Sequence, residues 1–123
     1  MAITWFKKED GSGTASIYPT NITLNKAVSK KLTDFYAVRL GIDEKEKKVI
    51  IRFYDRNEAL NQNKNEIFIL SSALTYTRIS STEFVRCLSE TMKTDFSKGS
   101  RKYRCSYSES SHEVIIDLNK EVR

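Results

Sequence analysis

The chain has few of the residues from which metal and catalytic sites are built. It contains one histidine and two cysteines, and no Cys-x-x-Cys pair. A structural zinc site needs about four such ligands. The sequence therefore predicts no metal and no cofactor, and we expect Cys87 and Cys105 to be small, half-buried residues in a reducing cytosol. His112 stands alone in a polar turn, where a histidine usually faces solvent. We therefore predict that the protein is not an enzyme.

Long apolar runs and glycine-rich loops are also lacking. Residues Met1–Phe6 lack the apolar segment that a signal peptide requires. We therefore expect a cytoplasmic protein with no attachment to a membrane. Gly11 and Gly13 fall in a predicted hairpin turn rather than between a strand and a long helix, which argues against a phosphate-cradling loop.

Positive charge is in moderate excess. Lys and Arg number 21 against 16 Asp and Glu, which gives a net charge of +5 and an isoelectric point near 9.2. Such a bias raises the rate of encounter with anions, including nucleic acid.

The length of 123 residues and the 39% share of hydrophobic residues fit one domain, residues 1–123, with a modest core.

Alternation of apolar and polar residues predicts that most of the chain forms strands. Two segments instead have the spacing of short amphipathic helices, Lys26–Leu32 and residues 81–93. Ser80 and Glu83 before the second have the spacing of a capping box. The predicted strands are residues 3–5, 15–17, 20–24, 36–42, 49–53, 67–70, 74–79, 103–107 and 114–118.

The two halves of the chain share a plan. Residues 1–56 and 66–123, joined by the polar linker 57–65, each read as strand, helix, strand, turn and strand, and Val49–Phe53 matches Val114–Leu118. The pattern predicts a strand-rich α+β domain with two short helices, built as a pseudo-twofold pair of βαββ units that share one core. The alternative is that two helices among many strands resemble a repeat by chance.

The order of strand, short helix, strand and hairpin over Ile22–Phe53 resembles the swapped-hairpin fold of AbrB and MraZ-like transcription factors. MraZ-like proteins carry two such units in a chain of similar length. The resemblance implies a DNA-binding regulator, with Arg78 as the counterpart of the family's DNA-contacting basic residue. The chain departs from the family motif at Thr20–Asn21 and Leu24–Lys26, where the family has a Gly-Arg pair and a proline.

Basic residues gather in two places. Four of them lie within the seven positions from Lys98 to Arg104, beside a glycine and a serine that let a phosphate backbone approach closely. Others lie on the expected exposed face of the first helix. We predict a small cytosolic nucleic-acid-binding regulator whose contact residues are Lys26, Lys30, Lys31, Lys98, Arg101, Lys102 and Arg104.

A protein-interaction or assembly module, such as a homo-oligomer, is the alternative function. It would use an exposed strand edge or the aromatic residues Trp5, Phe6 and Tyr18. Aromatic side chains at a surface supply association energy, whereas in a core they pack the interior.

Overall fold

Antiparallel strands form most of the structure. The computed structural model describes residues 13–73 and 75–122. The helices are α1 (Lys26–Ser29), α2 (Arg56–Leu60) and α3 (Thr82–Met92). The strands are β1 (Gly13–Ile17), β2 (Asn21–Leu24), β3 (Ala37–Asp43), β4 (Lys48–Tyr54), β5 (Phe68–Ile69), β6 (Ser71–Ala73), β7 (Tyr76–Ser80), β8 (Arg101–Ser108) and β9 (Glu113–Val122).

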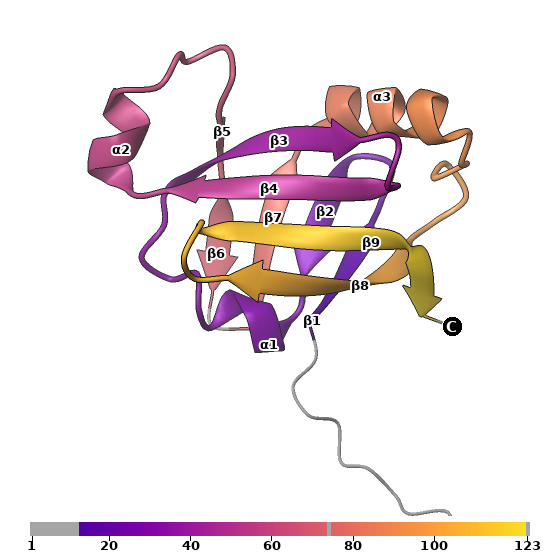
Figure 1. Ribbon diagram of the computed structural model, residues 1–123, viewed down its shortest axis with the longest axis horizontal. Helices are drawn as coiled ribbons and strands as arrows, with labels where there is room; N and C mark the ends of the chain where they lie inside the picture. Colours follow the sequence, from indigo (N-terminus) through magenta and orange to yellow (C-terminus); the bar gives the residue numbers. More distant parts are fainter. Residues whose placement is uncertain (1–12, 74, 123) are drawn as a thin grey trace, which may run out of the picture.

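All nine strands belong to one antiparallel sheet, in the order β5-β3-β4-β9-β8-β1-β2-β7-β6. In Figure 1, β3, β4, β9 and β8 form the front layer, and β1, β2, β7 and β6 lie behind them and run more steeply. The end strands β5 and β6 are separated in the chain by Leu70 alone and pair with β3 and β7 respectively. The sheet is therefore nearly closed and barrel-like, with short edges.

The core lies between the two layers and draws on both halves of the chain. Every second residue of the long strands points inward, as the strand period requires. Helices α1 and α3 lie at opposite ends of the sheet in Figure 1. Helix α1 contributes Val28 to the core, and α3 contributes Val85 and Leu88. The largest fully buried side chains include Phe53, Phe96, Ile17, Ile22, Leu24, Leu32, Ile51, Ile79 and Ile116.

The predicted α+β fold with a pair of βαββ units is wrong. The described residues form one continuous sheet with three helices rather than two. Strands from the two halves pair directly, β2 with β7 and β4 with β9, so neither half has a sheet of its own. The prediction failed because β1 pairs with β8 and β5 pairs with β3, which joins the two halves further, and strand pairing over such distances leaves no local signal.

The similarity of Val49–Phe53 and Val114–Leu118 has a direct physical basis. The two segments lie in β4 and β9 and pair with each other, with Val49 opposite Ile116 and Ile51 opposite Val114. These four side chains are fully buried in the same core. Two neighbouring strands that line one interior need the same alternation of large apolar residues.

Helix α1 begins at Lys26, as the sequence predicted, but the other boundaries of α1 and α3 differ from the predicted ones. Helix α1 stops at Ser29 rather than Leu32. Helix α3 is capped by Ser81, whose hydroxyl accepts a hydrogen bond from the Phe84 amide at 3.1 Å. Ser80 cannot serve as the cap because it is still paired with Asn21 in the sheet.

Helix α2 begins at the edge of the predicted polar linker 57–65. Asp55 accepts a hydrogen bond from the Glu58 amide at 2.8 Å, and the Glu58 side chain accepts one from the Asp55 amide at 3.0 Å. This is a reciprocal capping box. The Asp-x-x-Glu spacing was therefore a readable signal.

The predicted strand 3–5 and most of its hairpin turn lie outside the described residues.

Gly13 allows α1 to lie against the backbone of β1. A Cβ atom at Gly13 would be 2.4 Å from Val28 Cγ2 and 2.8 Å from the carbonyl oxygen of Cys105. Gly41 on β3 is a natural comparison, because a Cβ there would meet only the carbonyl oxygen of Ile50, at an ordinary 3.8 Å. The close approach of helix and strand thus depends on the missing side chain at one glycine and not the other.

Gly13→Ala is therefore expected to lower the free energy of unfolding by roughly 1–3 kcal/mol, as overpacking does. Gly41→Ala is the control, with an expected change within about 0.5 kcal/mol. Urea denaturation followed by circular dichroism measures both. Equal stability of the two variants would contradict the packing of α1 on β1.

Candidate nucleic-acid interface

Five neighbouring strands contain no acidic residue. As the structure bounds them, β8, β1, β2, β7 and β6 hold no Asp or Glu, whereas β9 holds three acidic residues and β3 holds one. On β8, β1, β2 and β7 the buried residues alternate with more exposed ones, and the latter form the outer face of the sheet. The outward residues are Lys102, Arg104 and Ser106 of β8, Thr14 and Ser16 of β1, Asn21 and Thr23 of β2, Tyr76, Arg78 and Ser80 of β7, and Ser71 of β6.

Strand register aligns four of these residues in one line, which we call the hydroxyl row. Lys102 lies opposite Ser16, Ser16 opposite Thr23, and Thr23 opposite Arg78. Neighbouring strands lie about 4.8 Å apart, so the row spans about 14 Å from one cation to the other. Two small hydroxyl side chains therefore lie between a lysine and an arginine, both of which are exposed.

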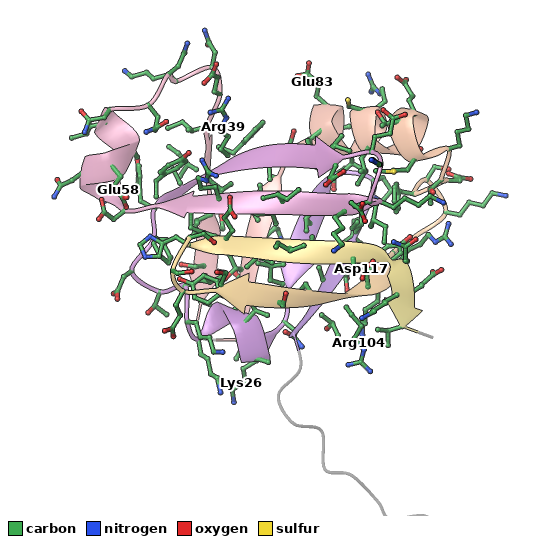
Figure 2. The ribbon with its side chains drawn as sticks, viewed as in Figure 1. Lys26, Arg39, Glu58, Glu83, Arg104 and Asp117 are labelled. Carbon is green, nitrogen blue, oxygen red and sulfur yellow. The ribbon has the colours of Figure 1, made fainter. Side chains whose placement is uncertain are left out.

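The start of α1 adjoins the same face. The Asn25 amide donates a hydrogen bond of 3.0 Å to the carbonyl oxygen of Thr14, and Thr14 lies opposite Arg104. Figure 2 shows Lys26 and Arg104 both projecting at the lower side of the molecule. Lys26 therefore lies on the same side of the molecule as Arg104 in that view, and Lys30 and Lys31 are exposed just beyond α1.

Arg101 and Lys98 have acidic neighbours that offset their charge. Arg101 donates two hydrogen bonds to the Glu121 carboxylate, from Nε at 3.0 Å and from Nη2 at 2.8 Å. These bonds raise the pKa of the Arg101 guanidinium. Lys98 lies in the loop before β8, where hydrogen bonds from Ser97 and the charge of Lys98 lower the pKa of Asp95. Of the predicted group in this part of the chain, Lys102 and Arg104 are the ones that the sheet presents outward.

The opposite face, formed by β3, β4 and β9, pairs its cations with carboxylates. Arg52 donates hydrogen bonds of 3.0 Å and 2.8 Å to Glu113 Oε2, which raise the pKa of the guanidinium. Arg39 lies 3.6 Å from Glu66, and Lys48 is the partner of Asp117 in the sheet. Within the described residues, Lys102, Arg104 and Arg78 form no such ion pair. Arg104 does lie opposite Asp117, so β9 marks the boundary of the cationic face.

Sequence reasoning found Lys102 but missed the two hydroxyl residues of the hydroxyl row. Arg78 was named only through the family resemblance, and Ser16 and Thr23 were not considered. The available signal was the absence of acidic residues from five strand segments, but the register that aligns them was not visible in the sequence.

The assembly alternative needs an exposed strand edge, and in the described part of the chain β5 pairs only with Ala37 and Val38, so residues 39–43 of β3 have no strand on that side. The end strands β5 and β6 have two and three residues. Tyr18 is exposed, as that alternative requires. Trp5 and Phe6 lie outside the described residues.

The two cysteines and the histidine, which are the candidate groups for catalysis or metal binding, lie on three different elements of the structure. Cys87 is exposed on α3, and Cys105 is buried on β8. His112 is exposed in the turn before β9, where its ring lies 5.2 Å from that of Phe35. The described residues contain no cluster of three metal-ligating side chains.

In the described part of the chain, no helix combines the length and apolar character needed to cross a membrane.

Comparison with family models, curated proteins and solved structures finds no match to this chain. The resemblance to AbrB and MraZ-like factors stays a prediction from the sequence.

The two thiols are expected to differ in reactivity. Burial raises the pKa of Cys105 to about 12, and the thiolate is the reactive form. An aromatic disulfide reagent should therefore modify Cys87 in the folded protein and Cys105 only on unfolding. Cys87→Ser should abolish the fast reaction, and Cys105→Ser should preserve it. Equal labelling of both thiols in the folded protein would be inconsistent with the buried position of Cys105.

The same pKa shift predicts a pH dependence of stability. The folded state retains the Cys105 proton, whereas the unfolded chain releases it above its ordinary pKa of 9.0. The contribution of this thiol is therefore fully present below pH 9.0 and is lost as the pH rises toward about 12. Denaturation of Cys105→Ala across this range should show a weaker decline than the unsubstituted protein.

Proposed function

We propose that this protein is a non-enzymatic, nucleic-acid-binding regulator that holds a sugar-phosphate backbone on the outer face of β8, β1, β2 and β7. The observation that carries the proposal is the hydroxyl row, in which exposed cations flank Ser16 and Thr23 on strands that hold no carboxylate. A cytoplasmic location is part of the proposal, because Cys87 and Cys105 are both free thiols.

The chemistry of this face suits phosphodiesters. Lysine and arginine neutralise phosphates, and serine and threonine hydroxyls donate hydrogen bonds to phosphate oxygens. Because the side chains between the cations are small, a nucleic-acid backbone can approach the sheet closely. Lys26 and Arg104 at the adjoining side extend the same charge. The opposite face has arginines as well, but Glu113 and Glu66 compete there for any anion.

Salt dependence distinguishes this mode of binding from others. Each neutralised phosphate releases about 0.7 to 0.9 counterions, so affinity falls with salt in proportion to the number of contacts. Contacts from Lys102, Arg104, Arg78 and Lys26 predict a log-log slope of roughly −3 to −4. Contacts of this kind position the protein on a backbone and do not select a base sequence.

The double variant Lys102→Ala/Arg78→Ala is expected to reduce the slope by about two, because it removes both cations of the hydroxyl row. Lys45→Ala/Lys64→Ala makes the same change in net charge at exposed positions outside the cationic face and should leave the slope unchanged. Fluorescence anisotropy of labelled, mixed-sequence DNA and RNA between about 50 and 200 mM salt measures both. Equal losses in the two variants, or no binding at the lowest salt, would overturn the proposal.

A further inference from the structure

Two exposed tyrosines lie on opposite sides of the hydroxyl row, diagonally across it. Tyr18 follows β1 in the turn to β2 and is 38% exposed, and Tyr76 begins β7 and is 37% exposed. Neither belongs to a described hydrophobic cluster. An aromatic ring left at the surface keeps its face available to a planar partner.

Backbone or side-chain contacts restrict the position of each tyrosine, and both side chains stay more than a third exposed. Tyr76 lies opposite Ala73, whose methyl group is too small to cover a ring. The Arg78 guanidinium lies over one face of the Tyr76 ring, 5.2 Å from its centroid, so a base would stack on the other face. The Tyr18 amide donates a 2.8 Å hydrogen bond to the Asn21 carbonyl oxygen, which closes the turn. Pro19 restricts the backbone next to it.

The positions of the rings follow from strand direction. Strands β1 and β7 are both antiparallel to β2 and so run the same way. Tyr18 lies two residues beyond Ser16, and Tyr76 lies two residues before Arg78. The rings are therefore displaced in opposite directions from the row. Two strand spacings and four residue rises separate them by about 16 Å, diagonally across Ser16 and Thr23.

Such an arrangement suits unpaired bases better than a duplex. A duplex is usually read by a helix or a two-stranded ribbon that enters a groove. Here the cations project mainly from the outer surface of a curved sheet, and the adjoining helix α1 has only four residues. Sheets that carry exposed aromatic residues between cations bind single strands, because every base has a face that stacks on an aromatic ring.

We propose that this face binds single-stranded nucleic acid, with one base stacked on Tyr18, a second on Tyr76, and the intervening phosphates over the hydroxyl row. This inference rests on the proposed function and specifies its ligand. The strand crosses the sheet diagonally, so the two stacked bases are not adjacent in the sequence of the oligonucleotide. The Arg78 guanidinium lies where it can contact both the Tyr76 ring and a phosphate.

The test compares the full chain with Tyr18→Leu, Tyr76→Leu and Tyr76→Phe. Leucine keeps an apolar side chain of comparable bulk but removes the π face, whereas phenylalanine preserves that face. The probes are a fluorescein-labelled oligothymidine, a mixed-sequence single strand, and a duplex of that mixed sequence. Anisotropy at low salt gives the dissociation constants, and urea midpoints check that each variant is folded.

We expect the single strands to bind more tightly than the duplex. Each leucine variant should weaken single-strand binding by roughly 5- to 100-fold, the range for loss of one stacked base. Tyr76→Phe should bind as the parent chain does. Tighter binding of the duplex, or leucine variants that bind single strands normally, would overturn the inference while leaving the proposed backbone contact intact. Failure of every probe to bind would instead overturn the proposed function.

Discussion

The position of β1 between β8 and β2 is the constraint on which the rest of the structure depends. This strand pairs with β8 over its whole length and with β2 from Ala15 to Ile17, and thereby joins the C-terminal hairpin to the N-terminal one. The front layer could not otherwise continue into the back layer, and the shared core would open. The same two pairings place Lys102, Ser16 and Thr23 in line. The interaction that closes the sheet therefore also builds the candidate interface.

The two faces of the sheet differ in charge because acidic residues occur on some strands and not on others. The two halves of the sequence do not differ in this way. Acidic residues occur on β3 and above all on β9, where Glu113 and Asp117 lie beside basic residues of the neighbouring strands β4 and β8. The strands of the other face alternate between buried apolar residues and small polar or basic ones. A modest net charge of +5 thus produces one face with compensated cations and one without. Such asymmetry directs an anion to a single side of the molecule.

Local pattern predicted much of the secondary structure but not how it assembles. The alternation around Val49–Phe53 and Val114–Leu118 identified two core strands, and the amphipathic spacing identified α3. Their pairing could not be read, because hydrogen bonds between strands far apart in the chain depend on the whole fold. The candidate site was likewise predictable only where a local pattern identified its residues. Lys102 and Arg104 were found as a basic cluster, whereas the compensation of Arg101 by Glu121 and the alignment of Arg78 required the register.

Mapping the bound surface tests the account most directly. Amide chemical shifts of the isotopically labelled full chain can be followed by NMR as a single-stranded oligonucleotide is added at low salt. The account predicts that the shifts concentrate on β8, β1, β2 and β7 and on the turn that holds Tyr18. Shifts concentrated instead on β3, β4 and β9, where the arginines are already paired, would contradict it.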